Sequence, residues 1–384
     1  MQNSWWTKLE QMDADQKRFV GFDADGKHLL VGPPGCGKTN LLVMRARYIY
    51  GNGLKNVLVL TFTRALQDFI RTGVAERKYL GTDQIQTFKS WALTHCGIYA
   101  PDLMKSYDRN ASFDVQRNQL LEILKTANER IGGKNLYDAV LVDEVQDLLL
   151  DEIKLLMQLS ERITVAGDTK QMIYETGQTV DALEPLGFIK TELKYHYRIG
   201  LSVADVADRA LQPAEDAQKL RANSQYNEEE LKSRSNLYEC ASRELQFETM
   251  YKTLELQLRS YPGEGLGVLV PRRFMVTELQ EKFERTPLAK SIAYHTEDGV
   301  EHSFQSGKLI HVLPFKSAKG TEFRAVHLYG LEELKYPQVR RELIFMAVTR
   351  AKTALDGYHT GKILGSVATA FAKQTPPPSL ADLL

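Results

Sequence analysis

A short glycine-rich segment carries the clearest chemistry in this sequence. Gly35 and Gly37 flank Cys36, Lys38 and Thr39 follow them, and an apolar run precedes the segment. The pattern G-x-x-x-x-G-K-[ST] between a strand and a helix is typical of a phosphate-binding loop. Glycines let successive N–H groups turn towards phosphate oxygens, and the helix N-terminus adds partial positive charge. The loop indicates nucleoside triphosphate binding, which fits a kinase or a switch GTPase as well as other NTPases.

Paired acids occur downstream at the position that such a loop requires. The apolar run 137–142 predicts a buried strand, and Asp143 and Glu144 follow it directly. We expect Lys38 to reach the β- and γ-phosphates, and Thr39 and Asp143 to ligate Mg²⁺ directly or through water. Glu144 would orient and deprotonate the attacking water. These residues predict hydrolysis of a nucleoside triphosphate with Mg²⁺ as cofactor.

The elements that position these residues alternate between apolar strands and helices, as in an open α/β sheet. Two expected strands end in hydroxyl–aromatic pairs, Thr61-Phe62 and Thr87-Phe88, and Lys89 follows the second. Ligands bind at such strand ends. An isolated Phe there is better explained as core. Two successive pairs also suit phosphate contact and base stacking on a single strand.

Two glutamines could contact the nucleotide. Gln16 lies upstream of the phosphate loop, where its amide can both donate to and accept from adenine. Taken alone, it is better explained as a solvated helix residue. Gln171 follows the expected strand 163–166, where it could sense the γ-phosphate.

Size and composition exclude several classes of protein. A chain of 384 residues is long enough for two domains, and 49 basic residues balance 49 acidic ones, so nucleic-acid binding must be local. The three cysteines form neither a disulfide framework nor a metal cluster. The sequence has no run of membrane-spanning length and no secretion signal at its start, which predicts a cytoplasmic protein without a membrane partner.

Taken in order, these motifs resemble those of superfamily 1 helicases of the UvrD/Rep type. The acidic motif, spelled DEVQD at 143–147, is the most specific of them, and the resemblance covers about residues 12–353. It implies an α/β fold of two RecA-like parallel-sheet domains in tandem, with a nucleotide cleft between them. It also implies ATP as the nucleotide.

The resemblance assigns nucleotide contacts to the second half of the chain. Tyr197 matches a residue that stacks on adenine, and Arg198 matches one that reaches the γ-phosphate. Glu322 corresponds to a residue on the nucleotide side. Arg350 would be an arginine finger supplied across the domain interface.

Nucleic-acid contacts follow from the same resemblance. Ser317 would face the nucleic-acid backbone, and Tyr174 would also contact the nucleic acid. Lys89 and Lys316 stand where His is common, and both could meet phosphate as point charges. The run after Tyr174 lacks the aromatic residue and Arg-Gly of the family, so one base-stacking platform is missing there.

We expect three parts in the chain. Residues 1–185 would form the first domain with a small helical insert at about 95–135, residues 186–362 the second, and residues 363–384 a tail. The leading hypothesis is an ATP-driven helicase or translocase that moves 3′-to-5′ on single-stranded DNA, with RNA not excluded. A nuclease or a repair or defence subunit is a possible partner. The alternative is a nucleic-acid-stimulated ATPase that signals to a partner with little unwinding.

Overall fold

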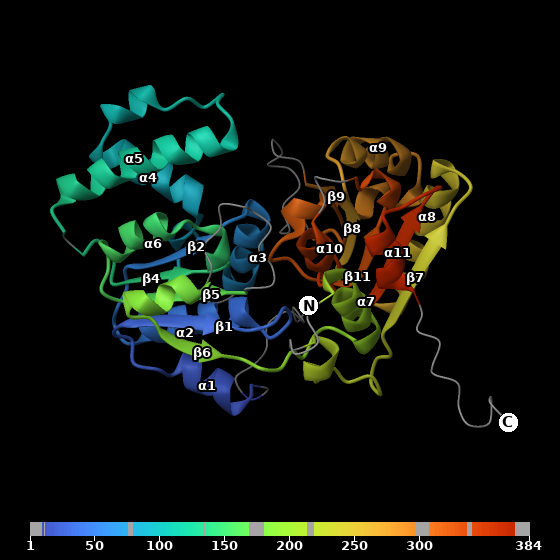
Figure 1. Ribbon diagram of the computed structural model, residues 1–384, viewed down its shortest axis with the longest axis horizontal. Helices are drawn as coiled ribbons and strands as arrows, with labels where there is room; N and C mark the ends of the chain where they lie inside the picture. The colour runs from blue at the N-terminus through green and yellow to red at the C-terminus, as the bar shows by residue number, and fades with distance from the viewer. Residues whose placement is uncertain are drawn as a thin grey trace.

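The computed structural model places two α/β domains side by side, as Figure 1 shows. It describes the following residues: 10, 12–75, 80–133, 135–168, 180–212, 219–295, 307–335 and 340–372. Each domain holds a parallel six-stranded sheet with helices on both faces. The predicted fold of two RecA-like domains in tandem is therefore confirmed.

The first sheet has the strand order β3-β2-β4-β5-β1-β6, and all its neighbouring strands are parallel. Its strands are β1 (Lys27–Val31), β2 (Val57–Thr61), β3 (Ile85–Thr87), β4 (Ala139–Val142), β5 (Ile163–Gly167) and β6 (Ile189–Glu192). The central strands are continuous apolar runs because helices bury them on both faces. The phosphate loop and the paired acids both follow central strands, so they meet at one edge of the sheet.

Two groups of helices cover this sheet. Their bounds are α1 (Ala14–Val20), α2 (Lys38–Gly51), α3 (Arg64–Ala75), α4 (Phe88–Tyr99), α5 (Phe113–Ile131) and α6 (Leu150–Met157). Residues of α1, α2 and α3 share one hydrophobic core, and residues of α4, α5 and α6 share the core of the opposite face. The expected helical insert is formed by the end of α4 and by α5, which lie above α6 in Figure 1.

The second sheet has the order β7-β12-β11-β8-β10-β9 and is also parallel. Its strands are β7 (Arg234–Glu239), β8 (Leu266–Val270), β9 (Ile292–Tyr294), β10 (Ile310–Pro314), β11 (Phe323–Leu328) and β12 (Ala351–His359). Its helices are α7 (Leu201–Leu211), α8 (Arg243–Ser260), α9 (Phe274–Phe283), α10 (Arg341–Val348) and α11 (Gly365–Phe371).

Two expected domain limits differ from the observed elements. β6 pairs with β1, so strand pairing favours a boundary after Glu192 rather than after residue 185. Helix α11 packs against α7 and buries Val367 and Ala370, so the second domain extends beyond residue 362 and any tail begins later. Among the described helices, none has the length and apolar character that a bilayer crossing needs.

Candidate nucleotide site

The phosphate loop adopts the strained backbone that its glycines permit. Gly35 has φ +78° and Gly37 has φ +90°, and Gly37 is the N-cap of α2. A Cβ on Gly35 would lie 3.0 Å from Ile199, and one on Gly37 would lie 3.6 Å from an Nη of Arg198. Ile199 and Arg198 directly precede α7 of the second domain. The phosphate loop therefore faces the second domain at close range.

Lys38 is held inside the loop. Its Nζ donates to the carbonyl oxygens of Gly32 at 2.7 Å and Pro33 at 3.1 Å, and lies 4.0 Å from Asp168. Burial lowers the pKa of Lys38, but Cys36, Asp168 and the nearby acids raise it by more, so the net shift is upward. The ammonium group therefore stays charged at the place where phosphates would lie.

The two predicted metal ligands meet across the sheet edge. Thr39 Oγ1 donates to Asp143 Oδ2 at 2.6 Å. Burial and the neighbouring Glu144 raise the pKa of Asp143 to about 7. Within the described part of the chain, no group of three His, Cys, Asp or Glu residues could hold a metal. Mg²⁺ at Thr39 and Asp143 would therefore take its other ligands from nucleotide and water, as is usual for this ion.

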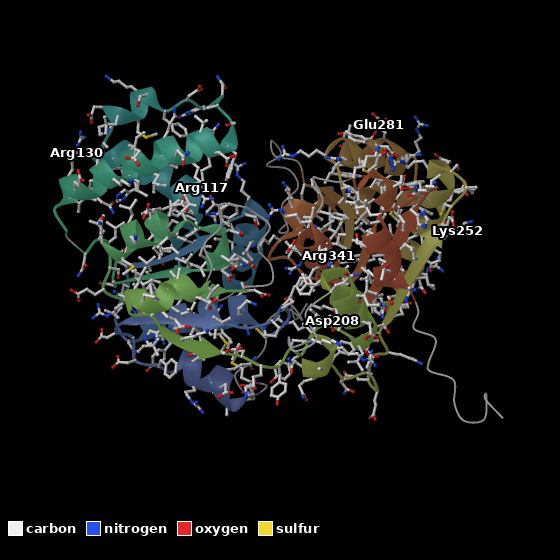
Figure 2. The ribbon with its side chains drawn as sticks, in the orientation of Figure 1. Arg117, Arg130, Asp208, Lys252, Glu281 and Arg341 are labelled. Atoms are coloured by element: carbon white, nitrogen blue, oxygen red, sulfur yellow. The ribbon has the colours of Figure 1, made fainter. Side chains whose placement is uncertain are left out.

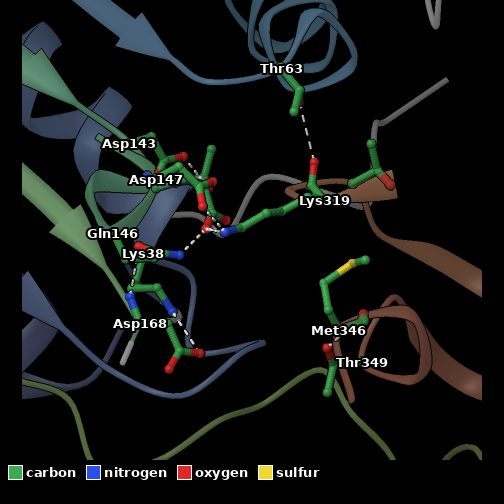
Figure 3. A network of polar contacts seen from close by, with 12 residues as sticks. Lys38, Thr63, Asp143, Gln146, Asp147, Asp168, Lys319, Met346 and Thr349 are labelled. Carbon is green, nitrogen blue, oxygen red and sulfur yellow. Dashed lines mark hydrogen bonds and ion pairs between the residues drawn. The ribbon is translucent and has the colours of Figure 1, made fainter. Parts of the chain in front are cut away.

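Glu144 is oriented by a glutamine to which the sequence analysis gave no role. Glu144 has a left-handed φ of 53°, rare for a residue with a side chain. Gln146 donates from Nε2 to Glu144 Oε2 at 2.5 Å, and its Oε1 accepts the backbone N–H of Asp168 at 3.1 Å. Figure 3 shows Gln146 between these two segments. The sequence signal that could have identified Gln146 was its position within the DEVQD motif.

A buried ion pair joins the two domains at the acidic motif. Lys319 follows η11 (Phe315–Ala318) of the second domain and is 1% exposed. Its Nζ lies 2.7 Å from Asp147 Oδ1 and 3.7 Å from Glu144 Oε2 (Figure 3). Burial raises the pKa of Glu144, but Lys319 and Lys38 lower it by more, so this carboxylate stays ionised. Lys319 lies close to Ser317 in the sequence, but its charge partner could not be identified without the fold.

We expect Lys319→Met to disfavour the closed arrangement of the domains. Asp147 is fully buried, and a buried carboxylate without its partner costs about 3–5 kcal/mol. Opening the cleft relieves that cost, so small-angle scattering should show a larger radius of gyration. Lys319→Met combined with Asp147→Asn removes both charges and should restore much of the compact form; an unchanged radius in the single variant would contradict this role.

Arg198 lies beside the phosphate loop, and one of its guanidinium nitrogens makes no hydrogen bond to the described residues. Its Nη1 donates to Glu322 Oε2 at 2.6 Å. Its Nη2 is buried without a hydrogen-bond partner among the described residues, next to Gly37. Burial raises the pKa of Glu322, while Arg198 and Lys352 lower it by more. A donor aimed at the phosphate loop fits the oxygen of a nucleotide phosphate, which is where the sequence analysis placed this arginine.

Arg350 is fixed by its own domain and buried at 5% exposure. Its guanidinium donates to the carbonyls of Met346 at 2.9 Å and Thr321 at 3.1 Å, and to Thr349 Oγ1 at 3.2 Å. Its positive charge also helps to lower the pKa of Glu144 in the first domain. The guanidinium is thus held in place by its own domain, and its role as an arginine finger stays a prediction.

Gln16 and Tyr197 lie near the loop and are linked through Asp13. Gln16 is buried, not solvated, and donates from Nε2 to the carbonyl of Cys36 at 3.0 Å. Its Oε1 accepts the backbone N–H of Asp13 at 3.1 Å, and Tyr197 OH donates to Asp13 Oδ2 at 2.5 Å. Their contact with adenine stays a prediction, and the observed bonds show that Gln16 also braces the loop.

Structural contacts occupy several of the expected nucleic-acid residues. Thr87 caps α4 by accepting the N–H of Ser90 at 3.2 Å, and Phe88 is 7% exposed against Trp91. Buried Thr61 donates to the carbonyl of Thr63 at 3.1 Å. Phe88 belongs to the core and offers no open face to a base in this arrangement. The structural explanation of the isolated Phe therefore holds at this position.

The other expected nucleic-acid residues are more accessible. Lys89 and Lys316 are exposed, while Phe62 and Ser317 are half-buried. Gln171 and Tyr174 lie outside the described residues, so their predicted roles stay predictions.

Two parallel sheets with a phosphate loop facing arginines of the second domain define a P-loop NTPase with an interdomain nucleotide site. Residues 17–177 match the family described as AAA domain, and residues 309–355 match the UvrD-like helicase C-terminal domain. Together with the motif order, these matches support a UvrD/Rep-like superfamily 1 helicase. The matched domains support an NTP-hydrolysing enzyme of the helicase type.

Among solved structures, the chain is similar to the PRRSV helicase, with 14% identity and a TM-score of 0.43. The alignment covers 89% of this chain and 54% of that one, so the chain spans about half the length of this neighbour. No curated protein matches the chain significantly.

Proposed function

We propose that the protein is an ATP-dependent translocase and helicase on single-stranded DNA, moving 3′-to-5′. The observation that carries this proposal is the meeting of charges from both domains around the candidate nucleotide site. Lys38 comes from the first domain; from the second, Arg198 lies beside the phosphate loop and buried Lys319 pairs with Asp147 of the acidic motif. A site built from two domains changes shape when its ligand changes, which is what a motor requires.

The residues divide the hydrolytic step between them. ATP with Mg²⁺ supplies the phosphoanhydride bond and the divalent charge. Lys38 and the loop N–H groups hold the phosphates, and Thr39 and Asp143 hold the metal. Glu144, oriented by Gln146, takes the proton from the attacking water.

The second domain stabilises the developing charge. Arg198 and Arg350 offer preorganised guanidinium groups to the γ-phosphate in the closed cleft. The same contacts make the triphosphate favour the closed state, and phosphate loss lets the domains separate. Single-stranded DNA that residues such as Lys89 and Ser317 hold across both domains is then moved once in each cycle of ATP hydrolysis.

A second candidate function is a nucleic-acid-stimulated ATPase that signals to a partner, such as a nuclease or a repair or defence subunit. The burial of Phe88 favours it, because this expected stacking ring is not available to a base. Fewer stacking contacts weaken the grip on a strand that directional movement requires.

We expect single-stranded DNA to stimulate ATP hydrolysis, with RNA compared in the same assay to establish the substrate. Displacement of streptavidin from oligonucleotides biotinylated at one end then separates the two functions. Displacement from the 5′ end, with none from the 3′ end, supports 3′-to-5′ movement. DNA-stimulated hydrolysis without displacement at either end would reject the motor and leave the signalling ATPase.

A further inference from the structure

A buried arginine of the helical insert contacts the backbone of the acidic motif. Arg117 lies on α5 and is 9% exposed. Its Nε donates to Glu152 Oε1 at 2.8 Å, and its Nη2 donates to Glu152 Oε2 and, at 2.8 Å, to the carbonyl of Asp147. Figure 2 labels Arg117 on the side of α5 nearer the sheet. Two-pronged pairing with Glu152 fixes the guanidinium plane, so the position of Asp147 depends on the insert.

Two phenylalanines cover the same guanidinium. The arginine carbon atom Cζ lies 5.8 Å from the ring centre of Phe62 and 6.0 Å from that of Phe113. The two rings meet edge to face at 6.5 Å. Phe113 is 45% exposed at the first turn of α5, and Phe62 directly follows β2. An exposed ring backed by a cation is a surface on which a nucleic-acid base can stack.

The opposite side of Asp147 contacts the second domain. Its carboxylate accepts the Lys319 Nζ at 2.7 Å, and Lys319 lies 3.7 Å from the catalytic Glu144. The insert thus holds the backbone of Asp147 while the second domain holds its side chain. A continuous set of contacts therefore runs from Phe113 through Arg117 and Asp147 to Lys319 and the closed cleft.

We propose that Arg117 is a positioning residue that couples strand binding at Phe113 to hydrolysis. The proposal rests on the proposed function, because it requires a nucleic-acid-stimulated ATPase. A base stacked on Phe113 fixes the ring that covers the guanidinium. The pairing of Arg117 with Glu152 and Asp147 then holds the acidic motif in register with Lys319, which favours closure.

The test measures ATP hydrolysis by the full chain against the concentration of a dT oligonucleotide. We expect Phe113→Ala to raise the half-stimulating concentration about tenfold, since one stacked base contributes about 1–3 kcal/mol. We expect Arg117→Met to lower the ratio of maximal to basal rate about five- to tenfold, with the half-stimulating concentration changed less than about twofold. A change in the stimulated rate without a change in the half-stimulating concentration distinguishes a coupling residue from a residue that only binds the oligonucleotide.

Folding needs its own control, because Arg117→Met leaves the buried Glu152 carboxylate without its charge partner. Arg117→Met combined with Glu152→Gln removes both charges and keeps an acceptor for the Leu149 N–H, so it should fold and show the same loss of stimulation. Arg130→Met is the matched control. Arg130 lies on the same helix, labelled in Figure 2, and pairs with exposed Asp102 at 2.6 Å.

Linkage gives a second readout. Fluorescence anisotropy should show that a non-hydrolysable ATP analogue changes oligonucleotide affinity less in the double variant than in the unsubstituted chain. Normal stimulation in the double variant, or an equal fall in basal and stimulated rates with a lower Tm, would overturn the coupling role. An unsubstituted chain that no oligonucleotide stimulates would instead reject the proposed function and the inference together.

Discussion

Lys38→Ala is expected to lower ATP turnover by about a hundredfold to a thousandfold, as removal of one preorganised electrostatic contact does in other enzymes. The Lys38 ammonium is only 10% exposed, stays charged, and lies within 4.0 Å of Asp168 at the sheet edge. Its Nζ donates to the carbonyl oxygens of Gly32 and Pro33, which hold it inside the loop. Steady-state hydrolysis with saturating ATP and single-stranded DNA measures the loss.

Lys55→Ala is the matched control for this variant. Lys55 lies in the same domain, but its Nζ contacts the carbonyl of Tyr50 at 2.8 Å and the ring of Tyr50 at 3.9 Å, away from the loop. Its turnover should stay close to that of the unsubstituted chain. Turnover of Lys38→Ala within about threefold of the unsubstituted chain would contradict the catalytic assignment of Lys38.

The sequence alone predicted the parts of the site that depend on local geometry. The phosphate loop and the paired acids follow apolar strands, and parallel strands bring their carboxyl ends to one edge. Thr39 and Asp143, distant in sequence, were expected to share a metal, and their side chains lie 2.6 Å apart. The two-domain fold was implied by the resemblance to superfamily 1 helicases that the motif order carries.

The remaining features depend on contacts that spacing does not encode. Lys319 lies between Ser317 and Glu322, to which the resemblance assigned roles, but its partner Asp147 becomes evident only when the domains are placed together. Phe88 was weighed as a base platform, but it is the first residue of helix α4 and packs in the core against Trp91. Arg117 had no motif at all; a charged residue within an amphipathic helix is usually solvated, and here it is buried.

Arg350→Ala is expected to lower turnover about a thousandfold while leaving ATP affinity within about threefold, because an arginine finger acts mainly in the transition state. The guanidinium is fixed by three acceptors of its own domain and its charge reaches Glu144 across the cleft. It is therefore preorganised for charge that develops during hydrolysis. Turnover and binding of a fluorescent ATP analogue, measured separately, test the two halves of this expectation.

Two further variants show whether the loss is chemical. Arg341→Ala changes an exposed arginine of α10, the helix that ends just before Arg350, and should keep full turnover (Figure 2). Arg350→Lys keeps the charge and loses the planar fork, so it should recover only part of the rate. Because Arg350→Ala removes one donor from each of the carbonyls of Met346 and Thr321, thermal unfolding must show that the variant is folded. A large loss of ATP affinity with little change in turnover would show that Arg350 binds the ground state and is not a finger.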